Sequence, residues 1–315
     1  MKVITLEQIE QILPSIDLIK SIEDGFAAYS QERAVVPPVG ELIMDQPPGE
    51  VHIKYGYLKD DEYYVIKIAS GFYDNPKMGL PSSNGMMLLF SQKTGEAKCI
   101  LQDQGHLTDL RTATAGAIAA KYLAPKKVSA IGVVGTGIQA KLQLQYLSDI
   151  TDARNVVVWG RSQSNLDAYE SEMSAHGFSV TTTMDMDDVG QHCNLIVTTT
   201  PSATPLLLSK HITRGAHITA VGSDAPHKQE LDAEILARAD LVVADSISQC
   251  MERGEIFQAI KGNTIRPEEL IELGNIILGA DEGRVNDDQI TVADLTGVAV
   301  QDIQIAKAVF EAPTN

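Results

Sequence analysis

The stretch VSAIGVVGTGIQA, residues 128–140, joins a short apolar run to three small residues, Gly135, Gly137 and Ala140. The run has the composition of a buried strand, and the small residues after it are typical of a tight turn into a helix. Gly135 permits the turn, Gly137 lets the backbone approach a pyrophosphate, and Ala140 lets the helix pack closely on the strand. This context predicts a dinucleotide-binding unit of Rossmann type, and a strand-to-helix turn without a ligand is the alternative.

The sequence around this motif alternates between short apolar runs and helical patterns. Helices are predicted near residues 139–148, 164–176 and 233–237, between apolar runs at 155–159, 178–183, 194–200, 217–224 and 240–246. Parallel β-α-β units explain this alternation, and strands so apolar suit a sheet that is covered on both faces. We therefore predict an α/β fold, with a Rossmann-type doubly wound parallel sheet over residues 123–294.

Residues 1–122 have a different pattern. Apolar residues spaced by three and four predict two helices that break near Pro14, and short β-rich runs from Val35 to Cys99 predict an antiparallel meander. A helix from Asp109 to about Ala124 follows, and Thr108 is its expected cap. The tail from Thr291 predicts a strand, a turn and a helix that returns to this first region. We expect residues 1–122 and 295–315 to form a second, α+β domain.

Composition excludes several classes of protein. The 315 residues suffice for two domains, and 25 basic against 42 acidic side chains give a net charge of −17, which disfavours nucleic acid and anionic membranes as partners. Cys99, Cys193 and Cys250 are too few and too far apart for a disulfide framework or a zinc site, so no metal is expected. No leader-like segment opens the chain, and no apolar run approaches the roughly 18 residues of a membrane span. These features predict a cytoplasmic protein.

The cofactor preference is predicted from the end of the second strand of the Rossmann unit. NAD-binding versions usually carry an acid there, but this strand is followed by Gly160, Arg161 and Ser162. A guanidinium and a hydroxyl suit a 2′-phosphate, so NADPH is favoured and NADH is possible; an ordinary surface arginine is the alternative for Arg161. The predicted cofactor-binding residues are Gly135, Thr136, Gly137, Ile138, Gln139, Ala140, Gly160, Arg161, Ser162, Thr199, Thr200, Val221 and Gly222.

Charged residues in apolar surroundings are the candidates for substrate chemistry. The guanidinium of Arg111, in a small-residue helix, matches a carboxylate, and Lys67 interrupts an apolar strand; a structural ion pair and a half-exposed strand explain them equally well. Asp224 follows a predicted strand at the edge where ligands bind, so it can exchange a proton with a substrate, with helix capping as the alternative. His52 and Lys54 share one strand face and can both face solvent.

The segments DLRTATAGAIAA (109–120), VGTGIQA (134–140), VGSDAPHKQEL (221–231), RGEI (253–256) and TVADLTGVAVQD (291–302) resemble the ornithine cyclodeaminase and mu-crystallin family over almost the whole chain. The resemblance implies a homodimer whose substrate and dimerisation domain is built from both chain ends. It implies that Lys67 and Arg111 hold a substrate carboxylate and that Asp224 is the acid/base group. It also implies that Ser82 and the turn Thr296-Gly297 lie near the substrate.

Two departures from the family pattern affect the expected reaction. Many members carry an arginine after a proline pair, but Val39 stands there in this chain, and His52 or Lys54 is the expected substitute. Cyclodeaminases that retain NAD have an acid at the position matching Gly160. The missing acid favours a ketimine reductase that converts Δ1-pyrroline-2-carboxylate to L-proline. The alternatives are an ornithine cyclodeaminase, a hydroxyproline dehydratase and a non-catalytic, crystallin-like NADP-binding protein.

Overall fold

The computed structural model describes residues 1–72 and 74–313, which form two compact units. Unit 1 is residues 1–111 with the C-terminal segment from residue 298, and unit 2 is residues 112–297. The boundaries differ from the predicted ones because the first falls inside one continuous helix, α3 (His106–Leu123), where no change in composition marks it. Residues 314 and 315 of the predicted C-terminal range lie outside the described residues.

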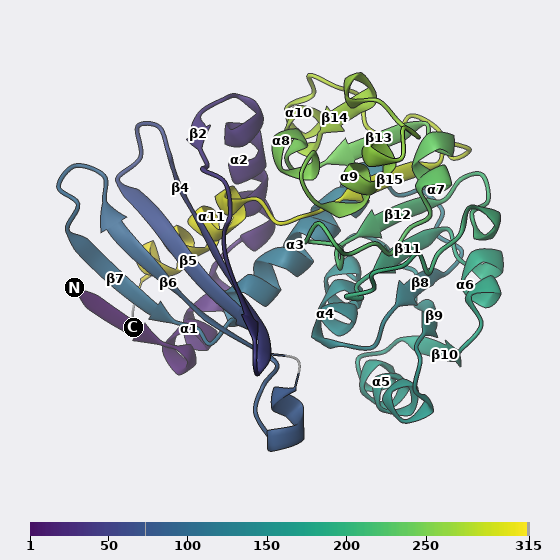
Figure 1. The fold of residues 1–315 in the computed structure, drawn as a ribbon, viewed down its shortest axis with the longest axis horizontal. Coiled ribbons are helices and arrows are strands. Elements are labelled where there is room, and N and C mark those ends of the chain that lie inside the picture. The colour runs from purple at the N-terminus through teal and green to yellow at the C-terminus, as the bar shows by residue number, and fades with distance from the viewer. Residues whose placement is uncertain (73, 314–315) are drawn as a thin grey trace. The chain divides into compact units, whose positions relative to one another are not determined.

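Unit 1 is a sheet with helices packed on it (Figure 1). Strands β4 to β7 are antiparallel neighbours, which confirms the predicted meander, while β1 pairs with β7 in parallel, which was not predicted. The last helix, α11, packs on α2 and along β4, β5 and β6. The elements are β1 (Lys2–Thr5), α1 (Leu6–Ile12), η1 (Leu13–Ser15), α2 (Leu18–Ser30), β2 (Ala34–Val35), β3 (Gly40–Asp45), β4 (Pro48–Leu58), β5 (Tyr63–Gly71), η2 (Asn75–Met78), β6 (Ser83–Ser91), β7 (Ala97–Gln102) and α11 (Ala299–Glu311).

The start of α3 corrects one prediction. Thr108 lies inside the helix, which begins at His106, so it is not the N-terminal cap. Asp103 acts there instead, because its Oδ2 accepts a hydrogen bond from the backbone N–H of Leu107 at 2.9 Å. A carboxylate near the first amide groups also interacts favourably with the helix dipole.

Unit 2 is a parallel sheet with helices on both faces, as predicted (Figure 1). Its strand order is β10-β9-β8-β11-β12-β15-β13-β14, and β8, β11, β12 and β15 are buried throughout. The elements are β8 (Ile131–Val134), α4 (Ile138–Leu147), β9 (Asn155–Trp159), α5 (Gln163–Ala175), β10 (Ser179–Thr183), α6 (Met186–His192), β11 (Leu195–Thr198), η3 (Ser209–His211), β12 (His217–Ala220), α7 (Ala233–Arg238), β13 (Leu241–Ala244), α8 (Ile247–Cys250), α9 (Gly254–Lys261), η4 (Pro267–Glu269), β14 (Leu270–Glu272), α10 (Leu273–Leu278) and β15 (Thr291–Asp294).

The order of the strands identifies where a ligand can bind. From β8 the chain moves outward to β9 and β10, and it then returns to the other side of β8 to form β11 and β12. The connections therefore reverse direction between β8 and β11. In open α/β sheets such a reversal leaves a crevice at the carboxyl ends of the two strands.

A buried histidine in this sheet makes stability depend on pH. His217, on β12, is fully buried, and its ring nitrogens lie 2.8 Å from Thr291 Oγ1 and 2.9 Å from Thr219 Oγ1. Burial, together with the nearby charge of Arg284, lowers the pKa of His217 from its ordinary 6.5 to about 3. The imidazole of His217 therefore takes up a proton near pH 6.5 in the unfolded chain, whereas in the folded protein it stays neutral down to about pH 3.

Replacing His217 should flatten the acid side of the stability profile. As pH falls from 6.5 toward 3, this one imidazole should remove about 1.4 kcal/mol of unfolding free energy per pH unit. The His217→Gln variant does not titrate there, so its stability should fall less steeply by that amount between pH 6 and 4. Urea unfolding of both proteins at several pH values measures the two slopes, and equal slopes would contradict the assignment.

Candidate functional site

The glycine-rich turn after β8 combines a strained position with an open one. Gly135 has a φ of 118°, and a Cβ there would lie 2.6 Å from Thr199 Oγ1, so only glycine fits. A Cβ on Gly137 would meet no atom within 4 Å, although this residue directly precedes the first turn of α4. The turn therefore leaves open space at the amide end of a helix, where an anion is favoured.

A cavity of about 300 Å³ opens beside this turn, at the carboxyl ends of β8, β9 and β11. It lies where the strand order reverses, so its position agrees with the rule for ligand sites in open α/β sheets. Predicted and unpredicted residues both line it. The full lining is Gly135, Thr136, Gly137, Trp159, Gly160, Arg161, Ser162, Asn165, Thr199, Thr200 and Pro201.

Trp159, Asn165 and Pro201 were missed by the sequence analysis, although each stands next to a predicted segment. Trp159 ends β9 and Pro201 follows Thr200. Their positions at the ends of predicted strands could therefore have identified both residues. Asn165 lies in the first turn of α5, and no pattern in the sequence marks it.

The other predicted cofactor residues do not line this cavity. Ile138 is 53 % exposed, whereas Ala140 is fully buried and its carbonyl accepts a hydrogen bond from Tyr169 Oη at 3.0 Å. Gln139 lies in the first turn of α4. Val221 is buried, and the N–H of Gly222 donates to Glu230 Oε2 at 2.8 Å.

The segment after β9, residues 160–162, carries no acidic side chain and leaves little room for one at position 160. Arg161 is exposed, and Ser162 Oγ lies 2.9 Å from Ser164 Oγ at the start of α5. A Cβ on Gly160 would lie 3.0 Å from Thr136 Cγ2 and 3.1 Å from Leu166 Cδ2. A side chain at position 160 therefore requires its neighbours to move.

Asp224 lies on the loop after β12 and forms an ion pair. Its Oδ1 accepts a hydrogen bond from Lys228 Nζ at 2.7 Å; the lysine side chain is 6 % exposed and the aspartate side chain 35 %. Arg253 Nη1 donates to the backbone carbonyl of Asp224 at 3.4 Å. The next helix, α7, begins at Ala233 with Asp232 as its cap, so Asp224 does not cap a helix. The sequence analysis missed Lys228, although its spacing of four residues from Asp224 is visible.

Unit 1 contains a cluster of buried cations, hereafter the cationic cluster: Lys54, Lys67 and Arg111. Lys54 and Lys67 stand directly opposite each other on β4 and β5, and they are 5 % and 2 % exposed. Lys54 is therefore not on a solvent-facing surface. Like charges placed opposite each other in a sheet are unfavourable, so this pair needs anionic compensation.

Asp302, on α11, provides part of that compensation. Its Oδ2 lies 3.5 Å from Lys67 Nζ, and its Oδ1 lies 3.0 Å from Arg111 Nε. Arg111 also donates from Nη1 to Gln301 Oε1 at 3.0 Å. The structural ion pair that was the alternative for Arg111 is thus present. Asp302 and Gln301 were missed because nothing local connects them to residue 111.

The remaining predicted substrate residues lie in varied surroundings. His52 Nε2 is 3.8 Å from a carboxylate oxygen of Glu41 and 4.0 Å from one of Glu50, and these two acids oppose the binding of a further anion at His52. Ser82 is exposed, and its carbonyl accepts a hydrogen bond from the backbone of Phe72.

The turn Thr296-Gly297 belongs to unit 2 and is held by Asp245. Thr296 Oγ1 donates to Asp245 Oδ1 at 3.1 Å, and the N–H of Gly297 donates to Asp245 Oδ2 at 2.6 Å. Gly297 has a φ of 81°, a conformation that favours glycine. Asp245 therefore fixes the turn that leads into α11.

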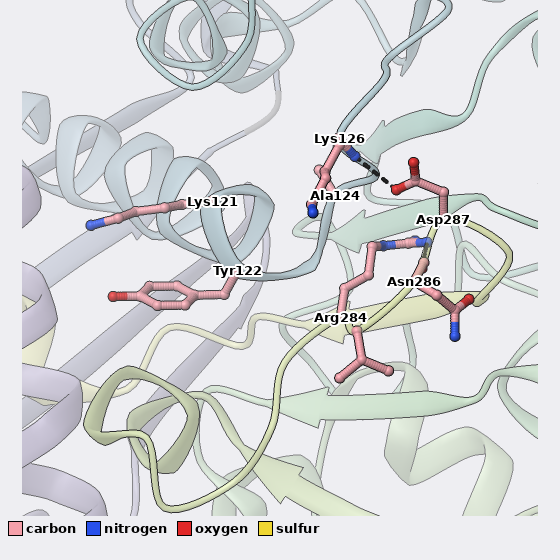
Figure 2. Close-up of a pocket in the computed structure, with 8 residues that line it drawn as sticks. Lys121, Tyr122, Ala124, Lys126, Arg284, Asn286 and Asp287 are labelled. Atoms are coloured by element: carbon pink, nitrogen blue, oxygen red, sulfur yellow. Dashed lines mark hydrogen bonds between the residues drawn. The ribbon is translucent and has the colours of Figure 1, made fainter.

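A second cavity of about 390 Å³ contains none of the predicted site residues (Figure 2). Arg284 lines it, but this guanidinium donates to the carbonyls of Leu123, Asn286, Gln289 and Ala216 and to Thr291 Oγ1. Figure 2 shows Arg284 reaching toward Asp287, whose carboxylate accepts a hydrogen bond from the backbone of Lys126. Arg284 is therefore engaged in holding segments of unit 2 together.

Residues 1–72 and 74–313 contain neither a cluster of metal ligands nor a membrane-spanning helix. No group of three or more His, Cys, Asp or Glu side chains in these ranges is placed to hold a metal ion. Within the same ranges, no helix is long and apolar enough to span a bilayer.

Comparison with known proteins gives the family. The model of the ornithine cyclodeaminase/mu-crystallin family matches residues 1–315. The chain belongs to this family. The predicted resemblance is thus confirmed, and all elements of the site described above fall within the matched range.

Members with quite different names resemble the chain over nearly its whole length. An uncharacterized cyclodeaminase of Sinorhizobium fredii is 42 % identical over 99 % of this chain and 95 % of that protein. The structure of an archaeal alanine dehydrogenase dimer with bound NAD has a TM-score of 0.90 and 33 % identity, covering 99 % of this chain and 95 % of that one. The Δ1-pyrroline-2-carboxylate reductase of Thermococcus litoralis, with NADH and L-proline, has a TM-score of 0.92 and 27 % identity, with coverages of 99 % and 97 %. Family membership therefore leaves the substrate open.

Proposed function

We propose that this protein reduces the C=N bond of a cyclic α-imino acid with NAD(P)H, converting Δ1-pyrroline-2-carboxylate to L-proline. The observation that carries the proposal is the cationic cluster around Asp302 in unit 1, because three buried cations are suited to a small carboxylate. The reductase of Thermococcus litoralis, whose structure holds NADH and L-proline, supports the choice of reaction.

The cavity of unit 2 fits a nicotinamide dinucleotide. Gly137 leaves open space at the amide end of α4, and the cavity continues past the ends of β9 and β11. In this proposal Gly135 and Gly137 cradle the pyrophosphate, and Thr199 and Thr200 contact the dinucleotide farther along the sheet edge. When bound, the reduced nicotinamide supplies the hydride for the reaction.

The cationic cluster is proposed to hold the substrate by its carboxylate. Arg111 is oriented by Asp302 and Gln301, so its planar guanidinium is fixed before a substrate arrives. Lys67, which shares Asp302 with Arg111, is the second anchor. A bound carboxylate would add a further negative charge beside the two cations that share Asp302.

Asp224 is proposed to handle the proton. The imine nitrogen takes up one proton, from solvent or from Asp224, and a hydride then adds to the imine carbon, which gives the amine. A protonated imine accepts hydride more readily, so a nearby carboxylate lowers the barrier by stabilising the positive charge. The ion pair with Lys228 holds the Asp224 carboxylate in place, which suits this stabilising role.

We also propose that the protein is a cytoplasmic homodimer. The dimer of the archaeal alanine dehydrogenase supports the assembly. Cys99, Cys193 and Cys250 are free thiols, and a reducing compartment suits them. Sedimentation of the purified chain tests the assembly directly.

A substrate panel tests the proposed reaction. The pure protein is incubated with NADPH or NADH and with pyrroline-2-carboxylate, piperideine-2-carboxylate, pyruvate plus ammonia, or ornithine, while cofactor absorbance and ammonia are followed. Fast oxidation with pyrroline-2-carboxylate is expected. Ammonia release from ornithine without net cofactor turnover would instead identify a cyclodeaminase. Because of the similarity to the alanine dehydrogenase, a linear imino acid is the second candidate, and preference for pyruvate plus ammonia would select it.

We expect NADPH to be used with a higher kcat/KM than NADH, and Arg161→Ala should reduce that preference about tenfold or more. Arg161 lines the cavity beside Ser162, and a charge-assisted hydrogen bond to a 2′-phosphate contributes roughly 1.5–3 kcal/mol. The matched control is Arg266→Ala, which removes an exposed arginine that pairs with Glu269. Equal use of both cofactors by the unaltered protein would contradict the assignment. Gly160→Asp is a poorer test, because its side chain would crowd Thr136 and Leu166.

A further inference from the structure

The carboxylate of Glu230 connects two neighbouring strands of unit 2 at their carboxyl ends. The residue is fully buried. Its Oε1 accepts hydrogen bonds from the N–H of Thr200 at 2.5 Å and from Thr200 Oγ1 at 2.8 Å. Its Oε2 accepts from Thr198 Oγ1 at 2.9 Å and from the N–H of Gly222 at 2.8 Å. One side chain therefore joins the segment after β11 to the segment after β12.

These two segments lead to different parts of the proposed chemistry. Thr199, Thr200 and Pro201 line the dinucleotide cavity, and Gly222 stands two residues before Asp224. The segments also touch each other, because a Cβ on Gly222 would lie 2.2 Å from the Thr200 carbonyl oxygen. The spacing between the cavity wall and the Asp224 loop is thus set by this contact and by Glu230.

A second buried carboxylate holds Glu230 itself. Glu255 Oε1 accepts a hydrogen bond from the N–H of Glu230 at 2.7 Å, and its Oε2 accepts from the N–H of Leu231 at 3.0 Å. Burial raises the pKa of Glu230 to about 7 and that of Glu255 to about 8. Burying two carboxylates is unfavourable for folding, and an apolar residue at 230 would leave four donors without their acceptor.

We propose that Glu230 is a positioning residue, which holds the Asp224 loop at a fixed distance from the cofactor cavity. The proposal rests on the function proposed above. Glu230 touches neither substrate nor cofactor in this scheme. Its effect on the rate is indirect. The hydride and the proton must reach the same C=N bond, so a small displacement of segment 199–201 or of the Asp224 loop lowers the rate.

The variant Glu230→Gln tests this role. Its amide group can accept hydrogen bonds at one oxygen only, so the NH₂ group must face either the donors of Thr200 or those of Thr198 and Gly222. We expect kcat to fall about tenfold or more, with the dissociation constant for NADPH changed less than about threefold. A larger isotope effect with 4-deuterated NADPH should accompany the loss. Glu230→Asp, which keeps the carboxyl group but is shorter, should recover part of kcat.

Hydrogen exchange gives a readout that is independent of activity. In the free protein, Glu230→Gln should raise amide exchange in both 199–201 and 222–225. The matched control is Asp232→Asn, which makes the same chemical change nearby; Asp232 accepts hydrogen bonds from the backbone of Ser209 and Glu234, outside both segments. This control should leave exchange in the two segments unchanged.

The outcomes separate the two proposals. If Glu230→Gln raises amide exchange in only one of the two segments, or evenly across the chain, the positioning role is overturned. An unchanged kcat of Glu230→Gln, when the unaltered protein is active, also overturns it. A kcat that returns to normal at lower temperature shows a purely structural role and also overturns it. If the unaltered protein reduces no imino acid of the panel, the proposed function fails, and the exchange experiment alone then decides whether Glu230 joins the two segments.

Discussion

The Asp224→Asn variant should turn over imino acid roughly 10²-fold more slowly than the unaltered protein, the usual scale for general acid/base groups. The substitution keeps the shape of the side chain but removes the negative charge that stabilises a protonated imine. NADPH affinity should change little, because Asp224 does not line the dinucleotide cavity. Fluorescence titration and NADPH oxidation on the same preparation measure the two quantities. Normal turnover would show that another group carries the proton, and His52 would be the next candidate.

The ion pair with Lys228 supplies the control for this experiment. Asp224→Asn leaves a buried ammonium without its carboxylate partner, which destabilises the loop. Lys228→Gln breaks the same ion pair but keeps the Asp224 carboxylate. If the ion pair alone matters, both variants lose the same activity. If Asp224 acts on the substrate, Lys228→Gln should retain more activity than Asp224→Asn, because the carboxylate is still present.

Arg111→Lys should lower kcat/KM for the imino acid about tenfold or more, although the charge is kept. The guanidinium contacts Asp302 through Nε and Gln301 through Nη1, whereas an ammonium is a single point of contact. Losing the fork should cost about 1.5–3 kcal/mol of carboxylate binding. Substrate KM and inhibition by L-proline, which carries the same carboxylate, are the measurements.

Further variants separate the contribution of Arg111 to substrate binding from its contribution to packing. Gln301→Ala removes one hydrogen bond to the guanidinium and leaves the charge, so its smaller effect measures how much orientation matters. Lys67→Ala should act in the same direction as Arg111→Lys, and the two losses should not add if both groups hold one carboxylate. A well-folded Arg111→Ala protein with unaltered kinetics would exclude Arg111 from the substrate site.

Local patterns in the sequence predict those features that depend on neighbours in the chain. The turn at Gly135 and Gly137 was predictable because a tight strand-to-helix turn imposes its own residue types. The alternating runs from 155 to 246 predicted parallel strands because period and composition are local properties. The same reasoning set Arg111 and Lys67 apart as charges in apolar segments.

Long-range pairings were not predictable in this way. Arg111 meets Gln301 across 190 residues and Asp302 one residue further on, and each of these residues alone is explained equally well by solvent or by a partner. Glu230 stands in the quoted segment VGSDAPHKQEL, but its four donors come from two strands, and no spacing along the chain indicates them. The insertion of β15 between β12 and β13 is likewise a matter of topology, which the strand sequence does not encode.

The position of β15 also has a consequence for synthesis on the ribosome. Because this strand separates β12 from β13, neither of these earlier strands has its final neighbour on that side until residues 291–294 have left the exit tunnel. The nascent chain must carry two unfinished sheet edges while most of its length is already outside, and such edges invite pairing with other chains. Since α11 follows at once and belongs to unit 1, both units reach their final form only after residues 299–311 have also left the tunnel.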